Sequence, residues 1–119
     1  MTSRALHFEI PIDDPDRATA FYRALFGWEP HQWGESPYWN VADDPAQPGI
    51  AGALAPRAEG GDGVLIYVGV DDIDAALERA SAAGGGVASP KSEVPGVGWV
   101  ARVRDTEGNV VGLLQPAMG

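Results

Sequence analysis

Two polar residues of the first predicted strand are the best candidates for chemistry. His7 and Glu9 stand two apart in the stretch that runs from Leu6 to Ile12. Side chains two apart on a strand share one face, roughly 6.5–7 Å from each other along it, so both can reach one small ligand. Imidazole and carboxylate groups are common general acids and bases, and they also hold polar ligands. A hydrogen-bonded pair that anchors neighbouring strands or a dimer contact is the equally simple alternative.

A helix predicted directly after this strand supplies a cover for its apolar residues. Asp14 is a suitable N-cap, Pro15 suits the first turn, and Gly27 ends the helix as a C-terminal cap. The apolar residues at helical spacing are Ala18, Phe21, Tyr22, Leu25 and Phe26. We expect this stripe to pack on the strand face that carries Phe8 and to leave the two polar residues on the other face.

The same plan appears twice in the chain. A shift of 58 residues (72 − 14 = 58) places Asp14 on Asp72, and a shift of 60 (99 − 39 = 60) places Trp39 on Trp99. The first copy predicts further strands near 28–34, 37–42 and 50–55. The second predicts a strand at 64–70, a helix capped by Asp71 or Asp72, and strands near 87–90, 98–104 and 109–115. The prediction is an α+β fold of two tandem β-α-β-β-β modules, 5–56 and 63–116, joined by a linker at 57–62 in a single domain (1–119).

The two copies differ where chemistry is possible. At the 58-residue shift His7 corresponds to Leu65, and Glu9 to Tyr67. Tyr67 shares the strand face of Leu65, and with Trp39 and Trp99 it is our candidate for binding the body of a ligand. The sequence does not say which way the two tryptophans point. Packing in the core is the alternative for all three aromatic residues.

Composition excludes several classes of function. The net charge is −9 with a pI near 4.4, and the sequence has no cluster of basic residues that could bind a phosphate backbone. We therefore expect no nucleic-acid or membrane partner. The absence of cysteine excludes disulfides and thiolate chemistry. No apolar run approaches the ~20 residues of a membrane helix, and we expect a cytoplasmic protein. Open sheet edges and several large aromatic residues predict a homodimer.

Three stretches of the chain resemble the vicinal oxygen chelate superfamily. They are Phe8-Glu9-Ile10-Pro11 with Asp13-Asp14-Pro15, Phe21-Tyr22…Phe26-Gly27-Trp28, and Asp105-Thr106-Glu107-Gly108-Asn109. This group includes glyoxalase I, ring-cleaving extradiol dioxygenases, and bleomycin- and fosfomycin-resistance proteins, and the chain is most similar to its lactoylglutathione lyase-related, glyoxalase-like branch. The likeness covers roughly residues 6 to 116. It implies a cavity walled by curved sheets, with a small-molecule ligand inside.

The resemblance also implies where a metal ion would be held, with one ligand in the first and one in the last strand of each copy. The matching positions here are His7, Gly52, Leu65 and Gly112. Only His7 can bind a metal, whereas a divalent ion needs three or four protein ligands. Glu9 and His31 could add ligands but do not match the family's positions. We therefore expect no metal and no other cofactor.

The resemblance and the residues together favour a protein that binds a small organic ligand in the sheet cavity. It would act without a metal, as a lyase or isomerase that uses His7 and Glu9 as acid and base. The alternative is a non-catalytic protein that sequesters an antibiotic or a metabolite, as the bleomycin-resistance proteins do. A metal-dependent glyoxalase or dioxygenase is the less favoured interpretation.

Overall fold

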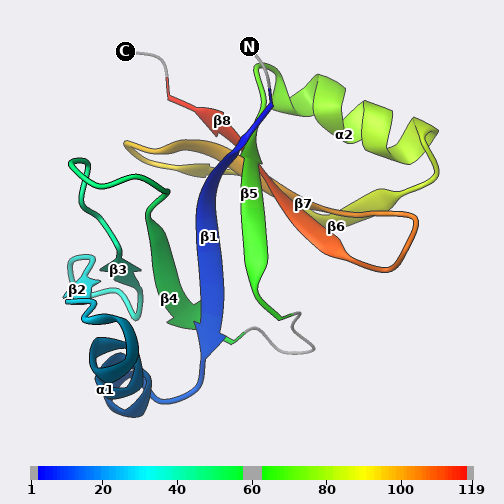
Figure 1. Cartoon of the computed structure of the whole chain (residues 1–119). Coiled ribbons are helices and arrows are strands. Elements are labelled where there is room, and N and C mark those ends of the chain that lie inside the picture. The colour runs from blue at the N-terminus through cyan, green and yellow to red at the C-terminus, as the bar shows by residue number, and fades with distance from the viewer. Residues whose placement is uncertain (1–2, 58–62, 118–119) are drawn as a thin grey trace. The chain divides into compact units, whose positions relative to one another are not determined.

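The structure, a computed structural model, describes residues 3–57 and 63–117 (Figure 1). Its chain contacts divide it into two compact units. One is His7–Val64, and the other is Leu65–Gly119 together with Met1–Leu6. Residues 58–62 of the expected linker lie outside the described residues. Within the described ranges, no helix is long and apolar enough to cross a membrane.

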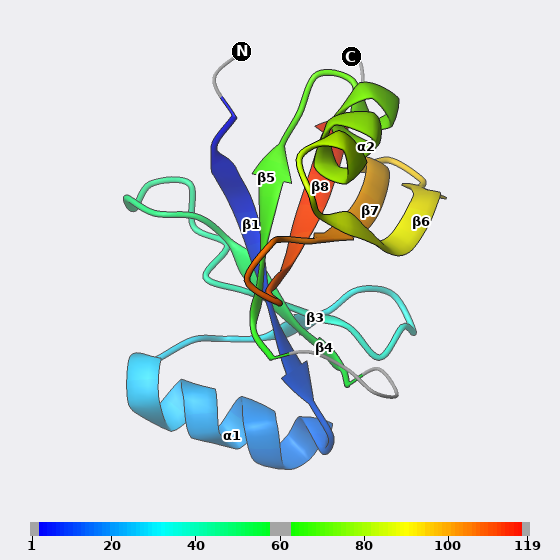
Figure 2. The same ribbon diagram turned by 90° about the vertical axis from the view of Figure 1, so that its right-hand side faces the viewer.

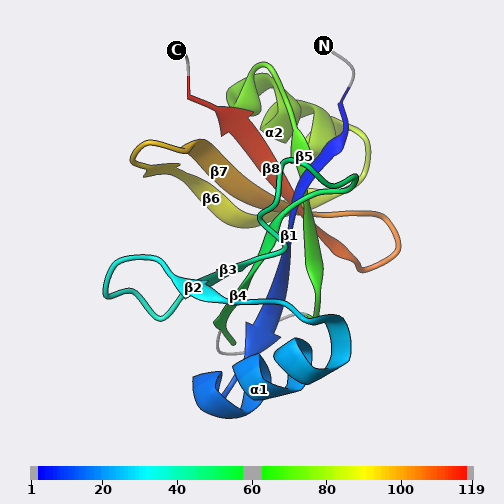
Figure 3. The same cartoon turned by 60° about the vertical axis from the view of Figure 1, so that its left-hand side comes forward.

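The unit His7–Val64 has the predicted order of one strand, one helix and three strands. The elements are β1 (Ala5–Ile12, which begins in the other unit), α1 (Pro15–Phe26), β2 (His31–Gln32), β3 (Trp39–Val41) and β4 (Gly52–Pro56). The strands lie in the order β2-β3-β4-β1, and β4 runs parallel to β1. The β2–β3 hairpin and α1 are seen in Figure 3.

Helix α1 begins and ends where the sequence predicts. The Asp14 carboxylate accepts a hydrogen bond from the backbone N–H of Arg17 at 3.1 Å, which satisfies one of the donors left open at a helix start. Gly27 takes the left-handed conformation with φ 73°, which glycine adopts without strain. Ala18 and Tyr22 of this helix pack on a core of buried residues from β1, β3 and β4. The core residues are Ile12, Val41 and Leu54.

The expected burial of the whole apolar stripe is wrong for three of its members. Phe21, Leu25 and Phe26 are 57%, 55% and 57% exposed, and no residue of α1 is fully buried. The apolar arc of the helix is wider than its contact with the core, because only Ala18 and Tyr22 of the stripe reach the buried cluster. Helix α1 therefore presents an apolar outer surface.

The second unit repeats the plan with β5 (Leu65–Gly69), α2 (Ile73–Ala82), β6 (Gly86–Val94), β7 (Gly98–Arg104) and β8 (Val110–Pro116). Its strands lie in the order β5-β8-β7-β6, with β5 and β8 parallel. Asp72 is the N-cap of α2, which packs on β6, β7 and β8 (Figure 2). Ile73 is fully buried in the core beneath this helix.

Strand β6 is longer than the predicted strand at 87–90. It continues to Val94, with register shifts between Val87 and Ser92 on either side of Ser89. Pro90 lies in this irregular stretch, and it has no N–H to give to a ladder. β6 is an edge strand, the last in the strand order. One of its edges is not paired with another described strand, so a residue without an N–H is tolerated there.

Candidate functional site

His7 forms a hydrogen bond with a tyrosine that lies 31 residues further along the chain. Its Nε2 atom is 2.8 Å from the hydroxyl oxygen of Tyr38, and the two rings are nearly parallel, with an interplanar angle of 10° and centroids 6.5 Å apart. Phe8 and Ile10 of β1 pack on the core under α1. Because side chains alternate along a strand, His7 and Glu9 lie on the face of β1 that points away from α1.

Tyr38 is held in place by the β2–β3 hairpin. The Trp33 N–H donates a hydrogen bond to the Tyr38 carbonyl at 2.9 Å, and the Trp33 and Tyr38 rings lie 5.7 Å apart. The sequence analysis did not identify Tyr38 as a site residue. No local signal identified it, because alternation places Tyr38 opposite Trp39 but does not say which of the two faces the core.

The environment of His7 favours a neutral imidazole. Burial lowers the pKa of His7 below its usual value, since the charged form loses hydration. A neutral imidazole has one N–H and one free nitrogen lone pair, so it can either donate to the Tyr38 hydroxyl or accept from it. Glu9 is half-buried on the same face, beside Ala53 of β4 and Asn40 of β3 in register. This face therefore combines a proton acceptor, a carboxylate and a phenol.

The structure does not bring Trp39 to that face. Trp39 is in register with Leu54, which is in register with Ile10, and all three contribute to the core cluster under α1. Trp99 in the second unit behaves in the same way. It packs against the core beneath α2, and the ammonium group of Lys91 lies 4.4 Å from the centre of its ring. Each tryptophan thus lies on the helix-covered face of the strands in its own unit.

Tyr67 is the one predicted aromatic residue that lies away from a helix. Its hydroxyl oxygen accepts hydrogen bonds from Nε and Nη2 of Arg102 at 3.2 and 3.1 Å. Its ring is buried and rests directly on Gly112, its register partner in β8. Arg102 is in register with the same glycine, so the guanidinium and the phenol share one face of this unit.

The family's metal positions do not fit a metal ion in this chain. Gly52 is wrong as the last-strand position of the first copy, because it is in register with Phe8 and a side chain there would meet the Phe8 ring. Ala53 occupies the face of Glu9 instead and offers no donor atom. Leu65 and Gly112 are equally without one. In the described part of the chain, no group of three or more His, Asp or Glu could hold an ion.

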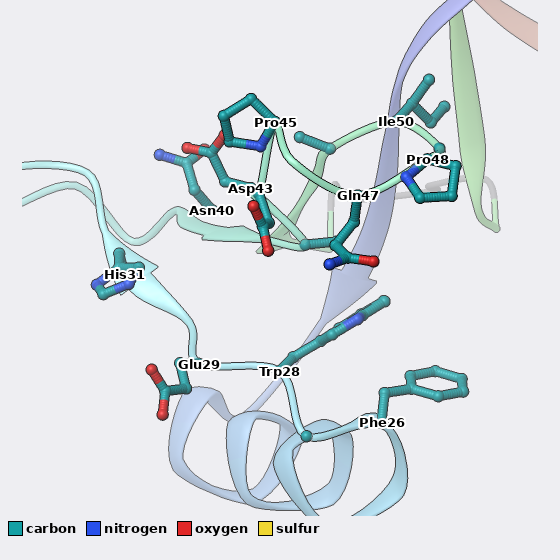
Figure 4. Close-up of a pocket in the computed structure, with 15 residues that line it drawn as sticks. Phe26, Trp28, Glu29, His31, Asn40, Asp43, Pro45, Gln47, Pro48 and Ile50 are labelled. Atoms are coloured by element: carbon teal, nitrogen blue, oxygen red, sulfur yellow. The ribbon is translucent and has the colours of Figure 1, made fainter.

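A separate surface cleft of about 600 Å³ lies in the unit His7–Val64 (Figure 4). One wall is the end of α1 and the segment after it, with Phe26, Trp28 and Glu29. The other wall is the β3–β4 loop, with Asp43 and Gln47. His7, Glu9 and Tyr38 are not among the residues that line it.

Comparison with known proteins identifies the family. The model of the Glyoxalase/Bleomycin resistance protein/Dioxygenase superfamily matches residues 4–113, and the chain belongs to this superfamily. The resemblance predicted from the sequence motifs is thus confirmed, as is the glyoxalase-like α+β fold class.

Two curated relatives are longer than this chain. "Putative glyoxylase CFP32" of Mycobacterium tuberculosis and of Mycobacterium bovis is 32% identical over 114 residues, which cover 92% of this chain and 42% of the relative. The chain therefore spans less than half the length of these curated relatives.

Two solved structures illustrate the fold. A superfamily member from Vibrio splendidus 12B01 has a TM-score of 0.68 at 17% identity, over 98% of this chain and 100% of that chain. Methylmalonyl-CoA epimerase from Mycobacterium tuberculosis has a TM-score of 0.65 at 17% identity, over 96% and 88% of the two chains. At these identities the likeness concerns the fold alone.

Proposed function

We propose that the chain binds a small organic ligand on the face that carries His7 and Glu9, and that these two residues exchange protons with it without a metal. The reaction class would be that of a lyase or an isomerase. The observation that carries this proposal is the 2.8 Å hydrogen bond between Tyr38 and a half-buried imidazole whose pKa is lowered by burial. A neutral imidazole in a fixed orientation is suited to accept a proton near neutral pH.

Glu9 supports the same role by its position. Its carboxylate stands two residues from His7 on the same face of β1, so both groups can reach one ligand and exchange protons with it. The structural likeness to a methylmalonyl-CoA epimerase is in keeping with an isomerase, although it rests on the fold. We therefore take acyl-CoA thioesters as the first substrates to test.

A second candidate is non-catalytic binding of an antibiotic or a metabolite. At the positions where the family holds a metal, Ala53, Leu65 and Gly112 offer no ligand atom. A metal ion that would polarise a substrate for reaction is therefore not supported there, which favours binding without catalysis. The superfamily also includes bleomycin-resistance proteins. Turnover separates the two candidates, since a sequestering protein returns its ligand unchanged.

The experiment uses chelator-treated protein with methylmalonyl-CoA and with bleomycin as probes. Binding is followed by the shift in melting temperature, because a ligand that binds the folded state stabilises it. Catalysis is followed by exchange of substrate hydrogen with deuterium from the solvent. We expect the double change His7→Leu with Glu9→Tyr, which installs the residues of the second copy, to abolish the response. The matched control is His31→Leu, the same change at the other histidine.

Two outcomes would contradict the proposal. One is a folded double variant that responds to the probe as well as the parent does. The other is a double variant that no longer folds, which would assign His7 and Glu9 to the scaffold. Loss of the response in the His31→Leu control would move the site to the cleft that His31 lines.

A further inference from the structure

We propose that the cleft between the end of α1 and the β3–β4 loop binds a small organic cation with a flat apolar body. Its volume of about 600 Å³ falls within the range of small-molecule sites. The cleft is lined by residues other than His7, Glu9 and Tyr38, so this site is independent of the function proposed above.

An aromatic floor gives the cleft a fixed surface on which a flat group can stack. Trp28 is half-buried, and its ring lies 5.4 Å from that of Tyr22, 4.9 Å from that of Phe26 and 5.9 Å from that of Phe8. These contacts hold the indole from the side of α1 and the core. Figure 4 shows the indole extending beneath the Gln47 side chain, with the Asp43 carboxylate on the same wall of the cleft to the left of Gln47.

The charged residues of the cleft are all acidic. Glu29, Asp43 and Asp44 line it, and no lysine or arginine does. Asp44 has a structural task, because its carboxylate accepts the backbone N–H of Ala46 at 3.0 Å and so shapes the loop. Figure 4 shows the Glu29 carboxylate directed away from the cleft. Asp43 is then the carboxylate available to a ligand above Trp28, and no ion pair involves it within the described residues.

The loop opposite Trp28 is restrained in shape. Ala42 has a φ of 54°, the one positive value at a non-glycine residue within the described ranges, and Gly49 has a φ of 112°. Pro45 and Pro48 lie between them, and proline fixes its own φ. A loop with few accessible conformations loses little entropy when a ligand binds to it.

Together the floor and the charge define the ligand class. A cation over the face of tryptophan is attracted by the ring's electron density, and a nearby carboxylate adds a direct ion pair. An amidinium or alkylammonium group carried on an aromatic or aliphatic body satisfies both contacts. An anion of the same shape would meet no lysine or arginine in the lining, whose other polar side chains are His31, Asn40 and Gln47.

The test compares three probes of nearly equal shape and different charge: benzamidinium, benzamide and benzoate. Binding is followed by NMR through the indole N–H signal of Trp28, with the indole signals of Trp33, Trp39 and Trp99 as internal references. We expect benzamidinium to bind in the millimolar range and to shift the Trp28 signal selectively. Benzamide should bind more weakly, and benzoate should not bind. Added salt should weaken benzamidinium binding, because exposed charges are screened.

The key variant is Asp43→Asn, which removes one charge from an exposed residue and leaves its size unchanged. We expect benzamidinium to bind about three- to fivefold more weakly, as for an exposed ion pair. Asp16→Asn is the matched control, because it removes the same charge from α1 at a residue that does not line the cleft. His7→Leu should leave benzamidinium binding unchanged, which separates this site from the first.

Three results of the binding comparison would overturn the proposal. They are equal binding of benzamidinium and benzamide, an Asp43→Asn affinity equal to that of the parent, and equal weakening by Asp16→Asn. The last result would mean that benzamidinium responds to the net charge of the protein and not to the cleft. Absence of any Trp28 shift at millimolar benzamidinium would also overturn it.

Discussion

Replacing Gly112 with alanine tests how Tyr67 is held in its unit. A Cβ atom at position 112 would lie 2.5 Å from Cε1 and 2.7 Å from Cγ of Tyr67. The ring would have to move by roughly 1 Å to restore an ordinary carbon–carbon separation of about 3.5 Å. Tyr67 is only 7% exposed, so its ring cannot turn out into solvent. The movement must therefore disturb the packing, the hydrogen bonds from Arg102, or both.

The expected magnitude follows from these contacts. Overpacking a buried site destabilises by about 1–3 kcal/mol. Weakening the hydrogen bonds from the half-buried Arg102 adds about 1 kcal/mol. The lower chain entropy of alanine in the unfolded state offsets roughly 0.4–1 kcal/mol. We expect Gly112→Ala to lower the free energy of unfolding by roughly 1–3.5 kcal/mol, measured by urea denaturation with tryptophan fluorescence.

Two other glycines provide controls for Gly112→Ala. At Gly86 an added Cβ would meet nothing within 4 Å, so Gly86→Ala should be neutral or slightly stabilising. At Gly52 the added Cβ would meet the Phe8 ring, which has no hydroxyl group, so Gly52→Ala should show overpacking alone. If Gly112→Ala is as stable as Gly86→Ala, Tyr67 does not rest on Gly112 as described, and the reasoning fails.

Four further predictions can be tested on the same protein. The pKa of His7 is lower in the folded than in the unfolded chain, so as the pH falls the unfolded chain binds a proton first. The free energy of unfolding should therefore decrease from about pH 6.5 downward, and it should decrease less in His7→Gln. An equal pH profile in both proteins would contradict this. Asp72→Ala should lower the free energy of unfolding by about 1 kcal/mol, and by more than Asp14→Ala does. The reason is that α2 begins with the fully buried Ile73, whereas α1 has no buried residue. Urea denaturation that ranks the two variants the other way would refute this prediction. A chelator should leave the melting temperature unchanged, and elemental analysis that finds one divalent ion per chain after dialysis would show otherwise. The exposed apolar surface of α1 leads us to expect a homodimer, which light scattering tests and a monomer mass at micromolar concentrations would disprove.

The sequence alone determined the order of the elements and where the helices begin, because the interactions that set helix starts join residues close in the chain. The N-caps at Asp14 and Asp72 each involve a backbone N–H three residues later. The turn at 105–109 is closed by the Asp105 carboxylate, which accepts the side-chain amide of Asn109 at 2.9 Å and the backbone N–H groups of Asn109 and Glu107 at 2.8 Å. The side-chain bond from Asn109 and then the two backbone bonds lower the pKa of Asp105. Alternation along β1 correctly separated His7 and Glu9 from the apolar residues.

The tertiary structure decided which residues share a site, because that depends on pairing between distant strands. A shift of one residue in the register reverses the face of every side chain, and it exchanges Gly52 for Ala53 beside Glu9. The same register turns Trp39 toward the core under α1. The partner of His7 is Tyr38, 31 residues away, which only the folded hairpin brings within 2.8 Å. Local patterns carry no information on such contacts, so the chemistry of this face became visible only in the folded chain.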